Sequence, residues 1–502
     1  MQQPPPALSG RGRWLALTAA LLGWMFDGLE MGLFPLVARP ALKDLLGTTD
    51  DALIGRWFAI ITAMFLIGAA TGGVLFGWLG DRIGRVRAMT LSVFTYAVFS
   101  GACGLATEAW HVAVLRFVAS LGMGGEWALG VALVMEIWPN KSRAWLAGII
   151  GSSANFGYMI IAVVGLGLNA LSEDLGRFLI SIGFSPETKE ILVRNSGWRI
   201  LMLFGALPAL LTFFIRLFVP ESHRWEQANE KGATSYWEAR DLLGVLIGAV
   251  AALGMIALWA FDLPWIVRIG GTLVALVIVA VGYLHPIRRY LQRSNARHPQ
   301  GAQKTRATTR RLLLAAGLSG VALLGTWGST QWAPVWVDQM TGGTNPDAKA
   351  YTQIVSAIGA VIGGILASLA GERFGRRPTY AVLCLASMAA VFGLFRLNIE
   401  FGTTLLVWVF VVGGFTASFY GWIPLYLPEL FATRMRATGQ GFGFNFGRVL
   451  AAIGVLQLPV IMKQFDVSYA QACPILSLVY IVGFVLIWFA PETKGKPLPE
   501  DD

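Results

Sequence analysis

The chain has 502 residues, of which 55% are hydrophobic and 14% are charged, and its formal net charge is +10. Soluble domains carry roughly 25% charged residues, so the composition excludes an ordinary soluble domain. The Lys and Arg residues gather in alternate loops, which is typical of a membrane protein and not of a nucleic-acid-binding protein. The three cysteines fall in apolar runs, so we expect no disulfide framework.

The apolar runs have about the length that crosses a bilayer as a helix, and they predict an all-α polytopic membrane protein. A tail (1–13) precedes six spans within 14–219. The segment 220–310 holds an inserted helical hairpin and a loop with eight Lys and Arg residues, and six more spans (311–490) lead to a second tail (491–502). The predicted spans are 14–37, 53–79, 88–106, 110–137, 144–170, 198–219, 242–261, 265–285, 312–337, 350–370, 378–397, 403–427, 437–462 and 470–490.

An even number of spans places both termini on one side of the membrane. The Lys and Arg residues of the loops predict that this side is the cytoplasm, in a plasma (inner) membrane protein. The long segment 171–197 is expected to be a polar loop on the other side.

The two sets of six spans carry matching charged motifs, which indicates an internal repeat. The sequence Gly-Trp-Leu-Gly-Asp-Arg-Ile-Gly-Arg at 77–85 is matched by Ser-Leu-Ala-Gly-Glu-Arg-Phe-Gly-Arg at 368–376. Repeats related by an axis along the membrane normal bind substrate between them, near the midplane. The charged positions of these motifs are Asp81, Arg82, Arg85, Glu136, Arg143 and Glu221 in the first half and Glu372, Arg376, Glu429, Arg436 and Glu492 in the second.

The motif at 77–85 resembles the loop 2–3 motif of the major facilitator superfamily. With the inserted pair, the run Asp27–Glu30 and the run Arg116–Trp127 are similar to the sialate/proton and neighbouring metabolite/proton symporters of its sugar-porter-like branch. The resemblance implies two six-helix bundles, and it implies that the charged motif residues hold one conformation closed. The alternative is that these charges serve only to orient the chain in the membrane.

Four charged residues lie well inside the first and fourth predicted spans: Asp27, Glu30, Arg116 and Glu126. Asp27 and Glu30 are three residues apart on the first span and so share a helix face. A charge at a helix centre costs roughly 2.5–3.5 kcal/mol to insert, so such residues are functional candidates. The resemblance implies that Asp27 faces Arg116 and exchanges this partner for a proton; the alternative is a static ion pair. Glu30 and Glu126 are either further proton or substrate sites or structural carboxylates.

Arg448 lies about three turns into the eleventh span of the two bundles and should face a cavity, because an unpaired cation in lipid is costly. A guanidinium binds carboxylates through two hydrogen bonds, which favours an anionic substrate. The alternative is a pair with an acidic residue of the first or fourth span. The other candidate substrate contacts are the polar and aromatic residues Asn155, Tyr158, Gln331, Trp332, Tyr420, Trp422 and Asn445.

These features predict a proton-coupled symporter of a small organic anion or sugar acid that functions as a monomer in the lipid bilayer. The chain has no Walker motif, metal-ligand cluster or nucleophile triad, so we expect neither an enzyme nor a cofactor. A neutral sugar or polyol symporter is the second hypothesis. A drug/proton antiporter typically has a Gly-Pro motif in the fifth span, and the run Gly148–Gly157 contains no proline. A sensor that transports nothing is a fourth hypothesis, which the motifs in both halves disfavour.

Overall fold

The computed structural model describes residues 10–138, 143–170, 172–207, 209–230, 232–295, 301–342, 344–345 and 347–499. Every regular element in these ranges is a helix. Thirteen of the described helices are long and apolar enough to cross a membrane, judged by length and composition. The predicted all-α membrane fold is therefore confirmed. Most of the predicted N-terminal tail lies outside the described residues.

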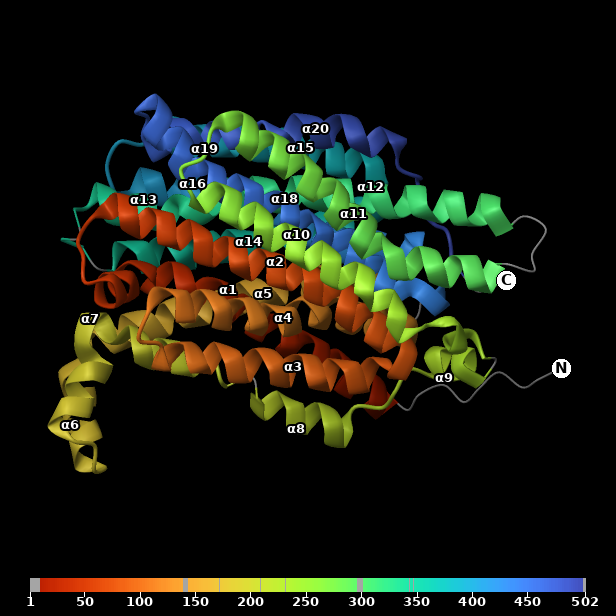
Figure 1. Ribbon diagram of the computed structural model, residues 1–502, viewed down its shortest axis with the longest axis horizontal. Helices are drawn as coiled ribbons and strands as arrows, with labels where there is room; N and C mark the ends of the chain where they lie inside the picture. The colour runs from red at the N-terminus through yellow and green to blue at the C-terminus, as the bar shows by residue number, and fades with distance from the viewer. Residues whose placement is uncertain are drawn as a thin grey trace.

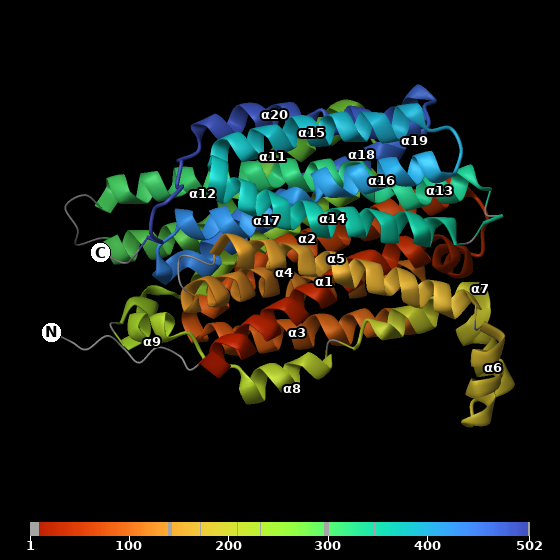
Figure 2. The same ribbon diagram turned by 180° about the vertical axis from the view of Figure 1, so that it is seen from behind.

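Figures 1 and 2 show two groups of helices side by side, one red to yellow and one teal to blue. The first group, called the N-half, forms the predicted first bundle. It comprises α1 (Gly10–Leu46), α2 (Asp51–Ile83), α3 (Arg85–Ala102), α4 (Ala109–Ile137), α5 (Arg143–Ala170), α6 (Ser172–Ser181), α7 (Pro186–Phe204) and α8 (Ala209–Phe218).

The sixth predicted span differs from the continuous helix 198–219 that we expected. It is divided between the last residues of α7 and α8, which pack along α3, so neither part counts among the thirteen long helices. The predicted polar loop 171–197 also contains helix, namely α6 and the start of α7. The backbone leaves helical geometry at Arg194–Gly197, where three residues in succession have positive φ. In Figure 1, α6 projects from the end of the bundle across the direction of the other helices.

The second group, called the C-half, contains helices that break beside the centre of the molecule. The seventh bundle span is interrupted at Ser329, and the tenth is interrupted at Ala417. Non-helical backbone at membrane depth is tolerated where it is buried in protein or lines a cavity. The elements are α12 (Gly301–Gly328), η5 (Thr330–Trp332), α13 (Ala333–Met340), α14 (Ala348–Phe374), α15 (Arg376–Leu397), α16 (Thr403–Thr416), α17 (Ser418–Tyr426), α18 (Arg436–Phe465), α19 (Tyr469–Ser477) and α20 (Val479–Leu486).

The inserted hairpin consists of α10 (Leu242–Ala260) and α11 (Trp265–Asn295), preceded by the short α9 (His223–Glu230). It packs on the outside of the bundles, against α2 and α12 (Figure 1). Many of its apolar side chains are exposed, which suits contact with lipid. The hydroxyl groups of Tyr283 and Thr71 form a buried hydrogen bond of 2.6 Å that fixes the hairpin to α2.

Two glycines allow α1 and α5 to cross in direct backbone contact. A Cβ atom on Gly28 would lie 1.6 Å from the carbonyl oxygen of Ala154, and a Cβ atom on Gly157 would lie 1.6 Å from that of Met25. No side chain fits at either position without separating the helices. This crossing holds Asp27, the neighbour of Gly28, at the centre of the protein.

Candidate functional site: a cavity between the two halves

A central cavity lies between the halves, with about 850 Å³ of space that protein atoms do not fill. Helices α1, α4 and α5 line it from one side, and α12, η5, α14, α16, α17 and α18 line it from the other. Five of the predicted substrate contacts line this cavity: Arg448, Asn155, Tyr158, Gln331 and Tyr420.

Two opposite charges line the cavity from opposite halves. Asp27 on α1 is 4% exposed and Arg448 on α18 is 5% exposed. Each acts on the other electrostatically, yet no direct ion pair joins them among the described residues. The Nη1 atom of Arg448 has no hydrogen-bond acceptor, and its guanidinium lies 5.3 Å from the ring centroid of Phe444. The arginine therefore presents an unsatisfied donor in the cavity that it lines.

Glu126 on α4 is the second carboxylate next to Asp27. It is 1% exposed and interacts with Asp27 both electrostatically and at hydrogen-bonding range. Its carboxylate fits against α1 because a Cβ atom on Gly23 would lie 1.7 Å from Oε1 of Glu126. The Tyr96 hydroxyl also interacts with the Glu126 carboxylate, but neither Glu126 oxygen has a well-formed hydrogen bond within the described part of the chain. Two carboxylates in such a position can be joined by one shared proton, which also removes their mutual repulsion.

The predicted pairing of Asp27 with Arg116 is not present in this conformation. Arg116 instead donates a 2.8 Å hydrogen bond to Oε1 of Glu30, and both side chains are buried. The reason is the rise of α4: Arg116 and Glu126 are ten residues apart on this helix, which separates them by about 15 Å. Because Glu126 lies level with Asp27, Arg116 is level with a later part of α1.

The rings of Phe34 and Phe65 hold the Arg116 guanidinium between them. Their centroids lie 4.9 and 4.7 Å from its central carbon, so two cation–π contacts add to the ion pair with Glu30. Arg116 thus lines a smaller pocket beside the central cavity. The geometry is that of a buried ion pair, in which Nε of Arg116 and Oε2 of Glu30 still have no hydrogen-bond partner among the described residues.

Three predicted substrate contacts do not line the central cavity. Trp332 packs on Phe58, with ring centroids 4.9 Å apart, and lines the smaller pocket. The Nε1 atom of Trp422 donates to the carbonyl oxygen of Arg376 at 3.1 Å. Asn445 donates from α18 to the carbonyl oxygen of Gly124 on α4 at 2.9 Å and thereby joins the two halves. These residues were predicted to line the cavity because they have both polar and apolar atoms. In the structure the ring of Trp332 packs on another aromatic ring, and the polar groups of Trp422 and Asn445 bind backbone carbonyl oxygens.

The sequence analysis missed an aromatic wall of the cavity. Trp127 stacks on Phe444 with ring centroids 4.0 Å apart, and Trp24 lies 5.7 Å from Trp127. Helical spacing could have identified these residues, because Trp24 is one turn before Asp27, Trp127 follows Glu126, and Phe444 is one turn before Arg448.

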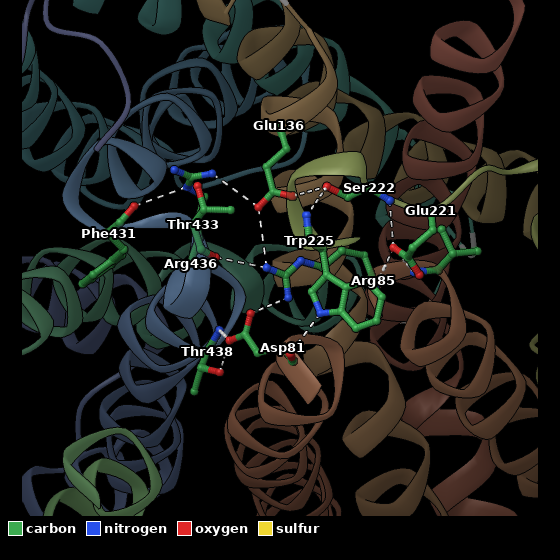
Figure 3. A network of polar contacts seen from close by, with 11 residues as sticks. Asp81, Arg85, Glu136, Glu221, Ser222, Trp225, Phe431, Thr433, Arg436 and Thr438 are labelled. Carbon is green, nitrogen blue, oxygen red and sulfur yellow. Dashed lines mark hydrogen bonds and ion pairs between the residues drawn. The ribbon is translucent and has the colours of Figure 1, made fainter. Parts of the chain in front are cut away.

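The charged motifs meet at one end of the bundle, here called the motif face, and join the two halves there (Figure 3). Arg85 pairs with Asp81 and donates to the carbonyl oxygen of Thr433 at 3.2 Å. Asp81 accepts a 2.9 Å hydrogen bond from the backbone N–H of Thr438, near the start of α18. Asp81 therefore faces the N-terminus of α18, where a carboxylate is stabilised by the helix dipole.

Two further acids complete the network on this face. Glu136 pairs with Arg436 of the other half at 3.3 Å and with Arg85 at 3.6 Å (Figure 3). In the C-half, Arg376 binds Glu429 through two hydrogen bonds of 2.7 and 3.1 Å. Arg143 of the N-half approaches Glu429 at 3.8 Å. The paired motifs of the two halves therefore make pseudo-equivalent contacts.

Two predicted gate residues do not take part in the network among the described contacts. Glu372 is exposed and has no hydrogen bond or ion pair there, unlike its buried counterpart Asp81. Arg82 is exposed and lies over the ring of Trp78 at 5.0 Å instead of pairing with an acid. The repeat is therefore asymmetric at these positions.

The sequence Pro-Glu occurs after the last span of each half, at 220–221 and 491–492, and each glutamate caps the start of a helix, α3 in the N-half and α15 in the C-half. Glu221 accepts hydrogen bonds from the backbone N–H groups of Arg85 and Val86 at the start of α3. Glu492 accepts the equivalent bonds from Arg376 and Arg377. Burial raises the pKa of Glu221 despite these bonds. Burial acts in the same direction on Glu492, but four backbone N–H groups outweigh it and lower its pKa.

Hydrogen bonds also join the halves on the other side of the cavity. The Tyr158 hydroxyl donates to Oε1 of Gln331 at 3.0 Å. Gln353 donates to the carbonyl oxygen of Tyr158 at 2.8 Å and to that of Gly32 at 3.4 Å. Polar contacts between the halves therefore exist on both sides of the cavity.

Comparison with known proteins agrees with this architecture. The Sugar (and other) transporter family matches residues 29–247, and the Major Facilitator Superfamily matches residues 224–455. A putative metabolite transport protein of Haemophilus influenzae is 24% identical over 97% of this chain and 98% of its own length. The niacin transporter NiaP of Acinetobacter baylyi is 25% identical (97% and 96%), and the sialic acid transporter NanX of Escherichia coli is 22% identical (94% and 92%).

Among solved structures, the proton:xylose symporter XylE bound to 6-bromo-6-deoxy-D-glucose superposes with a TM-score of 0.67. It is 17% identical in sequence, and the alignment covers 97% of this chain and 98% of XylE. At this identity the likeness concerns the fold. The two family matches, which together span residues 29–455, and the curated relatives show that the chain is a membrane transporter of the major facilitator superfamily.

Proposed function

We propose that the protein is a proton-coupled symporter that imports a small organic anion across the plasma (inner) membrane by alternating access. One observation carries this proposal. Asp27 and Arg448 line the same cavity without touching, and a second carboxylate, Glu126, lies against Asp27. This arrangement replaces the exchange between Asp27 and Arg116 suggested by the resemblance.

The coupling follows from competition for Arg448. While Asp27 is ionised, its field offsets the charge of Arg448, which reduces the attraction of an external anion. When a proton is bound between Asp27 and Glu126, Arg448 is the uncompensated charge of the cavity, and a substrate carboxylate can bind it through two hydrogen bonds. Proton and anion therefore favour each other's binding, as thermodynamic linkage requires.

The loaded site carries no added net charge, because one proton accompanies one monovalent anion. Neutralisation inside the low-dielectric centre makes the loaded state easier to occlude than a site with an uncompensated ion. The halves then rotate about the cavity. The contacts of the motif face break in the state in which the cavity opens toward that face. The Lys and Arg residues of the loops support a cytoplasmic motif face.

The names of two relatives support an anionic substrate, since one is called a niacin transporter and another a sialic acid transporter. Niacin and sialic acid both carry a carboxyl group. A neutral sugar or polyol remains the second hypothesis from the sequence, but it gives no role to the unsatisfied Nη1 of Arg448.

The test is uptake into proteoliposomes under an imposed pH gradient, with nicotinate, benzoate, sialate and xylose as radiolabelled probes. We expect accumulation of one or more of the carboxylates and its loss when the gradient is collapsed by a protonophore. Accumulation of xylose alone would contradict the anionic substrate, and uptake that ignores the gradient would contradict proton coupling.

A further inference from the structure

An ion pair on the face opposite to the motif face joins the two halves directly. Arg39, near the end of α1, donates from Nη1 to Oδ2 of Asp338 on α13 at 2.8 Å. These residues are 299 positions apart in the chain and belong to different halves. Neither was identified from the sequence.

The same arginine is also held by its own half. Its Nη2 atom donates to both oxygens of Asp51, in the first turn of α2, at 2.9 and 3.1 Å. Asp51 is exposed, whereas Asp338 is mostly buried, with 13% of its side chain exposed. Asp338 also feels the charge of Lys349 on α14. Arg39 is therefore kept in position by Asp51 and reaches across to Asp338.

We propose that Arg39 and Asp338 form a latch that closes this face, while Asp51 only positions Arg39. The inference rests on the proposed alternating access, in which the halves rotate about the cavity. A bridge within the N-half survives such a rotation, whereas a bridge between α1 and α13 must break when the face opens. Arg39 and Asp338 thus set how often the cavity is reached from this side.

The contacts beneath the latch indicate a layered closure. Phe34 and Phe58 stack with ring centroids 5.5 Å apart, and Phe58 meets Trp332 of the other half at 4.9 Å. Below them the hydrogen bond from Tyr158 to Gln331 lies at the cavity. Phe34, Phe58 and Trp332 also line the smaller pocket, so this layer is not completely filled, and a directional ion pair above it is well placed to lock the closed state.

The test measures the distance between spin labels at Thr49 and Gln339, two exposed positions on this face in different halves. The native cysteines are buried and do not compete for the label. We compare Asp338→Asn, which removes the bridge between halves, with Asp51→Asn, which removes the bridge within one half. Partly exposed ion pairs are weak, so we expect Asp338→Asn to raise the population with the longer distance about two- to fivefold.

Asp51→Asn should leave the distance distribution unchanged, and Asp338→Glu should restore the closed population. The double variant Arg39→Gln/Asp338→Asn should open no further than Asp338→Asn, because both remove one interaction. The latch would be overturned if Asp338→Asn and Asp51→Asn raised the population with the longer distance equally. It would also be overturned if Asp338→Asn, with an unchanged melting temperature, did not raise that population. The distance measurement needs no substrate and no proton gradient. The latch can therefore be refuted while proton coupling holds, and proton coupling can be refuted while the latch holds.

Discussion

Replacing Asp27 with Asn removes the ionisable partner of Arg448 and keeps nearly the same volume. One proton for one monovalent anion makes transport electroneutral, so the pH gradient alone drives it. A gradient of 2 pH units is worth about 2.7 kcal/mol per proton, which corresponds to about 100-fold accumulation at equilibrium. In the variant the remaining carboxylate, Glu126, has lost the acid with which it would share the proton.

We therefore expect Asp27→Asn to accumulate the transported anion only to about the level reached without coupling to the pH gradient. Exchange of labelled for unlabelled anion across the membrane should continue. The assay is proteoliposome uptake with the imposed gradient, beside counterflow without it. Asp174→Asn, at an exposed carboxylate on α6, is the matched control and should accumulate like the parent protein. Near-normal accumulation by Asp27→Asn would refute this placement of the proton site.

Four further variants test neighbouring parts of the account. Arg448→Gln should weaken anion binding by about 2–5 kcal/mol in a direct binding assay and leave the melting temperature largely intact; unchanged affinity would remove its role. Gly23→Ala places a methyl group against the carboxylate of Glu126, so it should cost about 1–3 kcal/mol of stability in a thermal unfolding assay and lower accumulation, whereas no effect would contradict the close contact. Glu492→Gln should destabilise the protein above about pH 4.5 and have a diminishing effect as the pH falls below that value, because the lowered pKa of Glu492 makes its ionised form the stabilising one. Glu221→Gln should show the opposite pH trend, since burial raises the pKa of Glu221, and identical trends for the two would contradict the assignment.

Much of the fold could be predicted because membrane-spanning helices are long and uniformly apolar. The inserted hairpin was predicted for the same reason. The interruptions of the sixth, seventh and tenth spans were not predicted, because hydropathy does not register a helix that stops and restarts within an apolar run. The departure from helical geometry at 194–197 lies just before this sixth span, and Asn195 and Gly197, both at positive φ, are residue types that favour such a turn.

Single residues of the site were predicted better than their pairings. Asp27, Glu126 and Arg448 were selected because charges in lipid are costly, and the structure places all three together. The partner of Arg116 was not predictable, since Asp27 and Glu30 share one face of α1 and only the relative register of α1 and α4 decides between them. Pairs between halves, such as that of Arg39 and Asp338, leave no periodic signal in the sequence.

The most direct test of the coupling is to count the protons that accompany binding of the anion. Calorimetric titration of the purified protein with the transported carboxylate, repeated in buffers of different ionisation enthalpy, gives this number. At a pH where the free site is unprotonated, binding should take up about one proton per anion, and Asp27→Asn should take up none. Tight anion binding by the parent protein without proton uptake at any pH would contradict the claim that proton and anion share one site.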